Sequence, residues 1–194
     1  MCSSDLLLWR EASLYGDGKY ASDTNAVVFD TLTKQGTVLV EGTQGYGLGL
    51  HAGEYPFCTS SDCRAIDFLA MAGLNPWHRA VRNLAVWVVA RVNPIRVAGN
   101  SGRLFGETSW EQLGLPIEET TVTQKTRRVG LWDAALVAAA VEANGGAPVA
   151  RLALTMLDHE VPEVAGWEGL RPVSSLPPAA RAWRILMSRG CSST

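Results

Sequence analysis

The chain has 194 residues, of which 47% are hydrophobic and 19% are charged, and its formal net charge is −2 at pH 7. This composition is typical of a folded globular protein, and the length favours one domain over two. A net charge near zero without a polybasic tail argues against nucleic acid as a partner, and no apolar run reaches the roughly 18 residues that span a bilayer, which argues against a membrane segment.

The residues at positions 1–6, MCSSDL, form an unusual start. A GTG start codon followed by a common sequencing-adapter sequence would encode them. One hypothesis is therefore that the reading frame begins in an adapter read-through and that the chain is an N-terminally truncated piece of a longer protein. The alternative is a natural flexible N-terminus.

In the first half of the chain we expect two strands, a loop and a helix. The β-branched run at 37–42 predicts a buried strand, and the glycine-rich stretch after it predicts a loop. Residues 60–74 predict a helix with its N-cap within 60–62. Residues 84–95 are rich in Val and Trp without a helical stripe, so they predict a central strand.

The second half continues the alternation. Residues 108–115 predict a short helix, because a threonine stands three residues before a glutamate, as in a capping box. The Ala-rich segment 132–146 predicts a helix that ends at Asn-Gly-Gly, 149–158 predicts a strand, and 177–190 predicts a final helix. Strands that alternate with helices indicate an α/β fold with a mostly parallel sheet flanked by helices.

Two polar segments directly follow predicted strands. They are EGTQG at 41–45 and TMLD at 155–158. Ligands of open α/β sheets lie beyond the carboxyl ends of the strands, so we expect both segments to face one site. Asp158 could accept two hydrogen bonds from a guanine, or it could simply cap the next helix.

The segment EETTVTQKTRRVG at 118–130 is a second candidate for binding an anion. Threonine hydroxyls and guanidinium groups are suited to a carboxylate or a phosphate. The alternative, a solvated basic loop, is favoured by the spacing alone. Lys125 and Arg127 stand two apart, so in an extended loop they project to one side, while Arg128 is expected to point away into solvent.

The cysteines and histidines predict no metal site in this chain. Four cysteines lack the paired spacing of zinc ligands, and none of three histidines has a metal-type partner three or four residues away. Reduced thiols in a cytoplasmic protein are the simplest interpretation.

Five motifs in fixed order resemble the adenylosuccinate synthetase family. They are EGTQG, YPFCTSS, RVAG, TVTQKTRRVGLWD and LTMLD, and the resemblance covers about residues 37–160. The stretches PIRVAGNSG and TVTQKTRRVG look more like the divergent branch that includes phage 2-aminoadenylosuccinate synthetases. The resemblance implies the P-loop NTPase-like fold of this family, here N-terminally truncated, with the whole chain 1–194 as a single domain fragment.

The resemblance also implies a function in purine nucleotide biosynthesis. The family joins L-aspartate to IMP with GTP as the donor; the donor first phosphorylates the purine 6-oxygen, and the aspartate amine then displaces that phosphate. Alternatives are a 2-aminoadenylosuccinate synthase that uses dGMP and ATP, or a non-catalytic nucleotide-binding module. Mg²⁺ as cofactor and a homodimer of the full-length protein belong to the same expectation.

Family roles carry over residue by residue. Gln44, Thr59 and Lys125 match contacts to the substrate nucleotide, and Asp158 matches the aspartate that reads guanine. Met156 stands where the family has a lysine, which weakens the case for GTP. The matching positions of the aspartate-binding loop are Thr121, Val122, Thr123, Gln124, Lys125, Thr126 and Arg127, and those of the nucleoside triphosphate site are Arg127, Met156, Leu157 and Asp158.

The family's catalytic residues have no match in this chain. No segment before residue 41 contains the GDEGKG motif or the catalytic aspartate and histidine of the family's N-terminal half. We therefore expect the catalytic groups to lie in a missing N-terminal half and the chain alone to be inactive.

Overall fold

A computed structural model of the chain describes residues 23–169 and 171–178. The described residues form two compact units: one holds 23–41 together with 68–84, and the other holds 42–67 and the described residues from 85 onward. The expectation of a single domain stays a prediction. No helix within the described residues is long and apolar enough to cross a membrane.

The first unit contains helix α2 (Thr24–Thr33), which sequence reasoning did not predict. Its N-cap is Asp23, whose carboxylate accepts a hydrogen bond from Ala26 N at 3.1 Å. The ring of Phe29 lies 4.7 Å from that of His78, centroid to centroid. A capping aspartate followed by a mostly apolar segment is a local signal that could have revealed this helix.

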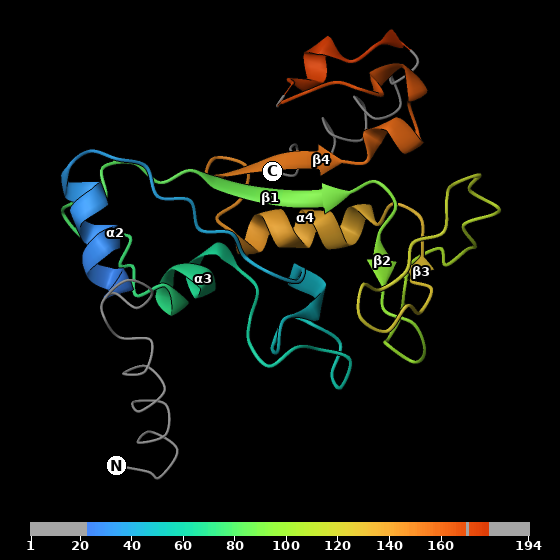
Figure 1. Ribbon diagram of the computed structural model, residues 1–194, viewed down its shortest axis with the longest axis horizontal. Coiled ribbons are helices and arrows are strands. Elements are labelled where there is room, and N and C mark those ends of the chain that lie inside the picture. The colour runs from blue at the N-terminus through green and yellow to red at the C-terminus, as the bar shows by residue number, and fades with distance from the viewer. Residues whose placement is uncertain (1–22, 170, 179–194) are drawn as a thin grey trace. The chain divides into compact units, whose positions relative to one another are not determined.

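The second unit is built on a parallel pair of strands. Strand β1 (Val86–Arg91) pairs with β4 (Ala150–Thr155) in parallel, in register from Val86↔Ala150 to Arg91↔Thr155. Helix α4 (Ala134–Ala143) packs along one face of this pair (Figure 1). The α/β class with a parallel sheet is thereby confirmed, and the predicted strands at 84–95 and 149–158 have these shorter bounds.

Helix α4 forms where the sequence predicts it. Its N-cap Asp133 accepts a hydrogen bond from Leu136 N at 2.9 Å, and alanines of high helix propensity follow. At the other end, the Asn144 amide donates to Ala140 O at 2.7 Å, and its oxygen accepts from Ala65 N at 2.7 Å. Asn144 thus ends α4 and also satisfies the first amide of helix α3 (Ala65–Met71).

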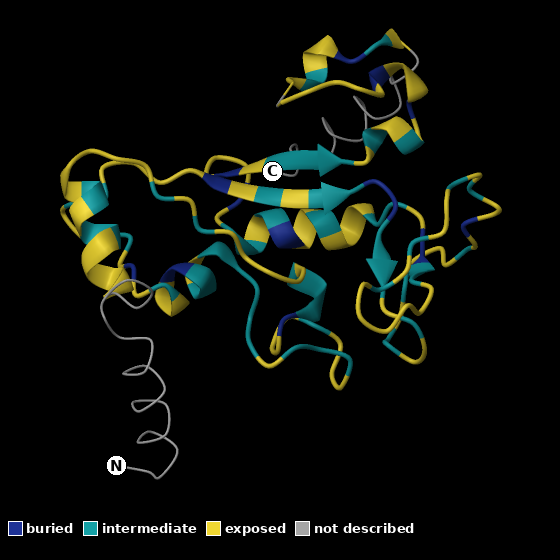
Figure 2. Ribbon diagram, in the orientation of Figure 1, coloured by how far each residue is buried: buried dark blue, intermediate teal, exposed yellow. Residues whose placement is uncertain are grey.

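Three predicted elements differ from the structure. Residues 37–42 are not a strand: they have no strand partner among the described residues, and Leu39 is 87% exposed. The segment that follows α2 is exposed or intermediate along its length (Figure 2). A run of β-branched residues becomes a strand only beside a neighbouring strand, because the ladder must satisfy its backbone groups. The predicted helix at 60–74 begins only at Ala65, since Asp62 binds His51 instead of capping the helix.

The predicted helix at 108–115 is a series of turns. Thr108 pairs with Val129 in an isolated bridge, and its hydroxyl donates to Gln112 Oε1 at 2.6 Å, so the capping box expected between Thr108 and Glu111 does not form. A capping box lies one residue later: Gln112 N donates to Ser109 Oγ at 3.1 Å, and Ser109 N donates to Gln112 Oε1 at 3.3 Å. The predicted helix at 177–190 lies almost wholly outside the described residues.

The main core of the second unit lies around the end of β4. Short 3₁₀ turns follow the strand: η2 (Leu157–His159), η3 (Pro162–Val164) and η4 (Val173–Ser175). The buried side chains are Val92, Val161, Val164 and Leu176, with Trp132, Leu154, Leu157 and Val173 packed against them. Burial of these apolar side chains fixes the carboxyl end of the sheet, where polar residues of β1 and β4 emerge.

Candidate functional site

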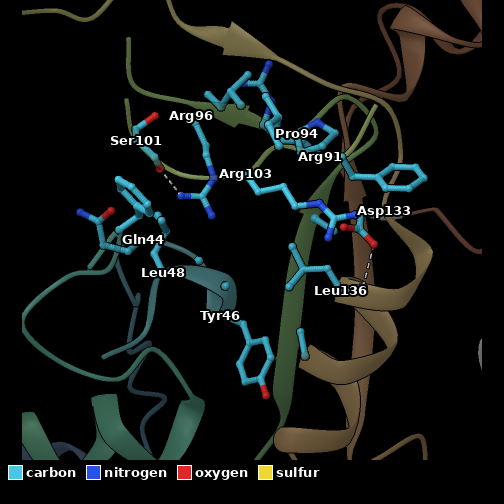
Figure 3. A pocket seen from close by; sticks show the side chains of 18 of the residues that line it. Gln44, Tyr46, Leu48, Arg91, Pro94, Arg96, Ser101, Arg103, Asp133 and Leu136 are labelled. Carbon is cyan, nitrogen blue, oxygen red and sulfur yellow. Dashed lines mark hydrogen bonds between the residues drawn. The ribbon is translucent and has the colours of Figure 1, made fainter. Parts of the chain in front are cut away.

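An open cavity of about 800 Å³ lies in the second unit. Its walls come from the glycine-rich segment 44–48, from 56–59, from β1, from the loop at 94–105 and from the start of α4. Figure 3 shows the glycine-rich segment on one side of the cavity and β1 and α4 on the other. The position beside the end of a parallel strand agrees with the general location of ligand sites in α/β folds.

The glycines of the segment EGTQGYGLG have two different roles. A Cβ on Gly47 would stand 3.0 Å from Leu136 Cδ1, so this glycine lets the 3₁₀ turn η1 (Tyr46–Leu48) pack against α4. A Cβ on Gly45 would meet nothing within 4 Å, and Gly45 lines the cavity. Gly47 lines the cavity as well, but a side chain there would meet Leu136, whereas the backbone at Gly45 is free for a ligand.

Gln44 adjoins this free backbone and has a left-handed conformation, with φ of +68°. Such a φ is uncommon for a residue with a side chain and is frequent at binding sites. Gln44 lines the cavity together with Thr59. Thr59 is held there because its backbone N donates to Leu48 O at 2.7 Å. This hydrogen bond connects segment 56–59 of the cavity wall to the glycine-rich segment 44–48.

The cavity carries an excess of positive charge. Its charged lining residues among those described are Arg91, Arg96, Arg103, Arg127 and a single carboxylate, Asp133. Aromatic and aliphatic side chains, including those of Phe57 and Trp132, make up much of the remaining wall. Guanidinium groups around an apolar pocket favour a ligand that combines a flat apolar ring with negative charge.

Two of these arginines are bound by the protein itself. Arg91 donates to both carboxylate oxygens of Glu118, at 2.5 and 3.2 Å, and this contact is the main reason why the pKa of Glu118 lies below its usual value. Arg96 donates to Ser101 O at 2.5 Å (Figure 3). These two side chains therefore shape the wall at the end of β1 and in the loop after it.

Arg128 does not point into solvent, so the expectation for this residue is wrong. Its guanidinium donates to both oxygens of Glu107, at 2.7 and 2.5 Å, to Ser101 Oγ at 3.0 Å and to Gly102 O at 2.8 Å. The contact lowers the pKa of Glu107. Arg128 lies in the short strand β3 (Arg128–Val129), which pairs antiparallel with β2 (Ile95–Arg96), and this pairing turns it toward the loop after β2.

The predicted aspartate-binding loop is a closed turn. Thr120 N donates to Lys125 O at 3.0 Å, and the hydroxyls of Thr120 and Thr123 lie 2.6 Å apart. Gln124 has φ of +50°, as the tight turn requires. Of residues 121–127 only Arg127 lines the cavity, and the other six are exposed.

Arg127 is fixed at its backbone. Its N donates to Glu118 O at 2.8 Å, and its O accepts from the indole of the buried Trp110 at 2.7 Å. The binding roles of residues 121–127, Lys125 included, stay predictions.

Residues 156–158 do not line the cavity. Met156 has φ of +58° and precedes η2, Leu157 packs against the core, and Asp158 is exposed. The two polar segments expected to face one site thus do not share this cavity, because the chain turns away from it after β4. The assignment of 156–158 to a nucleoside triphosphate stays a prediction.

Sequence reasoning missed four charged residues of the cavity. Arg91, Arg96, Arg103 and Asp133 carry no spacing signal of their own, although Arg96 lies within a motif and Asp133 directly precedes a strong helix. Within the described residues no three His, Cys, Asp or Glu side chains are grouped so as to hold a metal ion.

Comparison with known families gives a match over most of the chain. The sequence profile of the family described as adenylosuccinate synthetase matches residues 12–164. This range begins earlier than the 37–160 that the five motifs indicate. A curated relative, the adenylosuccinate synthetase of Archaeoglobus fulgidus, is 35% identical over 154 residues, which are 79% of this chain and 44% of the relative.

Phage enzymes are similar as well. The N6-succino-2-amino-2'-deoxyadenylate synthase of Vibrio phage phiVC8 is 45% identical over 95 residues, which are 47% of this chain and 26% of the relative. The structure of cyanophage S-2L succinoaminodeoxyadenylate synthetase, bound to dGMP and to dATP as an energy donor, has a TM-score of 0.65 and 28% identity and covers 87% of this chain and 45% of that one. The chain thus spans less than half the length of these relatives.

Proposed function

Because the chain belongs to the adenylosuccinate synthetase family, we propose that it forms part of a ligase of purine nucleotide biosynthesis. This ligase joins L-aspartate to a purine nucleotide. The observation that carries this proposal is the cavity, which combines apolar walls, a free backbone at Gly45 and an excess of arginines. A purine ring suits the apolar walls, and a phosphate suits the guanidinium groups.

In the proposed reaction the nucleoside triphosphate transfers its γ-phosphoryl group to the purine 6-oxygen. The aspartate amine then attacks C6, a C–N bond forms, the C6–O bond breaks, and the oxygen leaves with inorganic phosphate. Gln44 and Thr59 contact the acceptor nucleotide, and Arg127, held by Trp110 and Glu118, faces the anionic groups. Positive charge near the transferred phosphoryl group stabilises the negative charge of the transition state.

The acceptor and donor form two candidate pairs. IMP with GTP is the pair of the curated synthetases' family, and dGMP with ATP is the alternative. The structure of the cyanophage relative contains dGMP and dATP, which supports dGMP with an adenine nucleotide as a candidate pair. The proposal also includes Mg²⁺, which would neutralise phosphate charge, the binding of L-aspartate by residues 121–127, and a homodimer. Among the described residues, no three His, Cys, Asp or Glu side chains are grouped so as to hold the metal ion.

An isotope experiment tests the reaction directly. A protein of full family length that contains this sequence is incubated with aspartate, Mg²⁺, GTP and IMP that carries ¹⁸O at C6. In a parallel arm, dGMP with the same label at C6 and ATP replace IMP and GTP. We expect the label in inorganic phosphate and the succinyl product in one arm, only when aspartate is present. Triphosphate hydrolysis without label transfer in both arms would overturn the proposed function.

A further inference from the structure

The backbone just before Arg103 is held from several sides. Arg96 donates to Ser101 O, and Arg128 donates to both Ser101 Oγ and Gly102 O. The Ser101 hydroxyl in turn donates to Val97 O at 2.6 Å. Four hydrogen bonds thus fix two consecutive residues of a loop that would otherwise be free to move.

Gly102 gives this loop its path. Its φ is +94°, and a Cβ at this position would lie 2.7 Å from Phe57 Cβ, so only glycine fits. On the other side, Arg103 N donates to Glu54 Oε2 at 3.3 Å. The direction in which the chain presents the Arg103 side chain is therefore set by packing and by hydrogen bonds on both sides.

The guanidinium of Arg103 itself has no hydrogen-bond or ion-pair partner among the described residues. It is exposed and lines the cavity, between Arg96 on one side and Asp133 on the other (Figure 3). This differs from Arg91, Arg96 and Arg128, which all bind carboxylates or carbonyls of the protein. A fixed loop that ends in an unpaired guanidinium group within a cavity is suited to an external anion.

We propose that Arg103 binds the 5′-phosphate of the purine nucleotide in this cavity, and that Arg128 together with Glu107 positions it. The proposal rests on the proposed function and deepens it, because it assigns the phosphate end of the ligand to one wall of the cavity. A phosphate accepts two parallel hydrogen bonds from one guanidinium, which fixes the nucleotide's orientation as well as its affinity. The other anion to be considered is the aspartate carboxylate.

Calorimetric titration of the 194-residue chain separates these possibilities. IMP, dGMP, their nucleosides, L-aspartate and inorganic phosphate are titrated into the unmodified chain, into the variants Arg103→Leu, Arg103→Lys and Arg128→Leu, and into the control Arg82→Leu. Arg82 is exposed, belongs to the other unit and does not line the cavity. Circular dichroism and nucleoside binding establish that each variant is folded.

We expect the unmodified chain and the control to bind a nucleotide more tightly than its nucleoside. Arg103→Leu should lose this difference, about 10- to 100-fold for a hydrogen-bonded charge, with nucleoside affinity unchanged. Arg103→Lys should keep part of it, because lysine supplies the charge without the planar fork. In Arg128→Leu the difference should shrink while nucleoside binding stays, since the loop is released but the apolar walls remain.

Other results identify which claim is wrong. An unchanged nucleotide-to-nucleoside ratio in Arg103→Leu overturns the role of Arg103 and leaves the proposed function intact. Loss of aspartate binding alone in this variant assigns the anion to the carboxylate and also overturns the proposal. If the unmodified chain binds inorganic phosphate through Arg103 but neither nucleotide, the proposed function is wrong and the anion site remains. If the chain binds none of these ligands, the proposed function and the role of Arg103 are both wrong.

Discussion

Single residues of the second unit show how the same side-chain type takes opposite roles. Arg91 is 22% exposed at its side chain and binds Glu118, whereas Arg103 in the same cavity binds no carboxylate among the described residues. Gly47 and Gly45 differ in the same way, one facing Leu136 and the other facing open space. The surroundings of each residue, which one sequence does not reveal, decide between support and binding.

The ion pair of Glu118 with Arg91 makes a prediction about pH. Because the pKa of Glu118 is lowered in the folded chain, its stabilising contribution is present above the unfolded pKa of about 4.3 and is lost as the pH falls through the folded value. Glu118→Gln should therefore destabilise the chain by about 1–2 kcal/mol at pH 7 and by much less at pH 3.5. Urea unfolding at both pH values measures this, and Glu119→Gln, at an exposed neighbour, is the control. An equal loss at both pH values would show that the ionised pair contributes nothing.

The glycine pair gives a matched test at the same scale. Gly45→Ala should leave the unfolding free energy within about 0.5 kcal/mol, because its backbone is extended at φ of −136° and its Cβ meets nothing. Gly47→Ala should cost about 1 kcal/mol or more, because the added methyl group presses on Leu136. Nucleotide affinity should fall in Gly45→Ala, where the ligand lies against the backbone. Full affinity in a stable Gly45→Ala chain would argue that the ligand lies elsewhere.

Elements with strong local signals could be predicted from the sequence. Helix α4 has a capping aspartate, a run of alanines and an Asn-Gly-Gly stop, and β1 and β4 have apolar runs of the right length. Where a local signal competes with a tertiary partner, the prediction is wrong. Asp62 binds His51 rather than a helix terminus, Thr108 pairs with Val129, and residues 37–42 have no strand beside them among the described residues.

The candidate site could be predicted only in part. Ordered motifs identify the family, and three residues expected to bind ligands, Gln44, Thr59 and Arg127, do line one cavity. The wall formed by Arg91, Arg96 and Arg103 could not be predicted, because isolated arginines in strand ends and loops have no period or spacing. The orientation of Arg128 depends on its distant partner Glu107, which no local pattern indicates.

At the scale of the whole molecule, the chain spans 44% of its archaeal relative, so the reaction of the family is expected to need more than these 194 residues. We predict that the purified chain alone forms no succinyl nucleotide from IMP or dGMP, a triphosphate and aspartate. A general base and a phosphate-binding loop each contribute about 100-fold or more to such a reaction, so a chain without them should be inactive. Turnover above background in a coupled phosphate assay would show that the chain contains the chemistry.

The central claim is that the cavity between the glycine-rich segment and the arginine-bearing loop holds a purine nucleotide. A crystal structure of the chain grown with saturating IMP, and another with dGMP, tests this claim most directly. We expect electron density for a nucleotide in the cavity in at least one of them, with the base near Gly45 and the phosphate near Arg103. Density for the nucleotide at another place, with this cavity filled only by water, would contradict it.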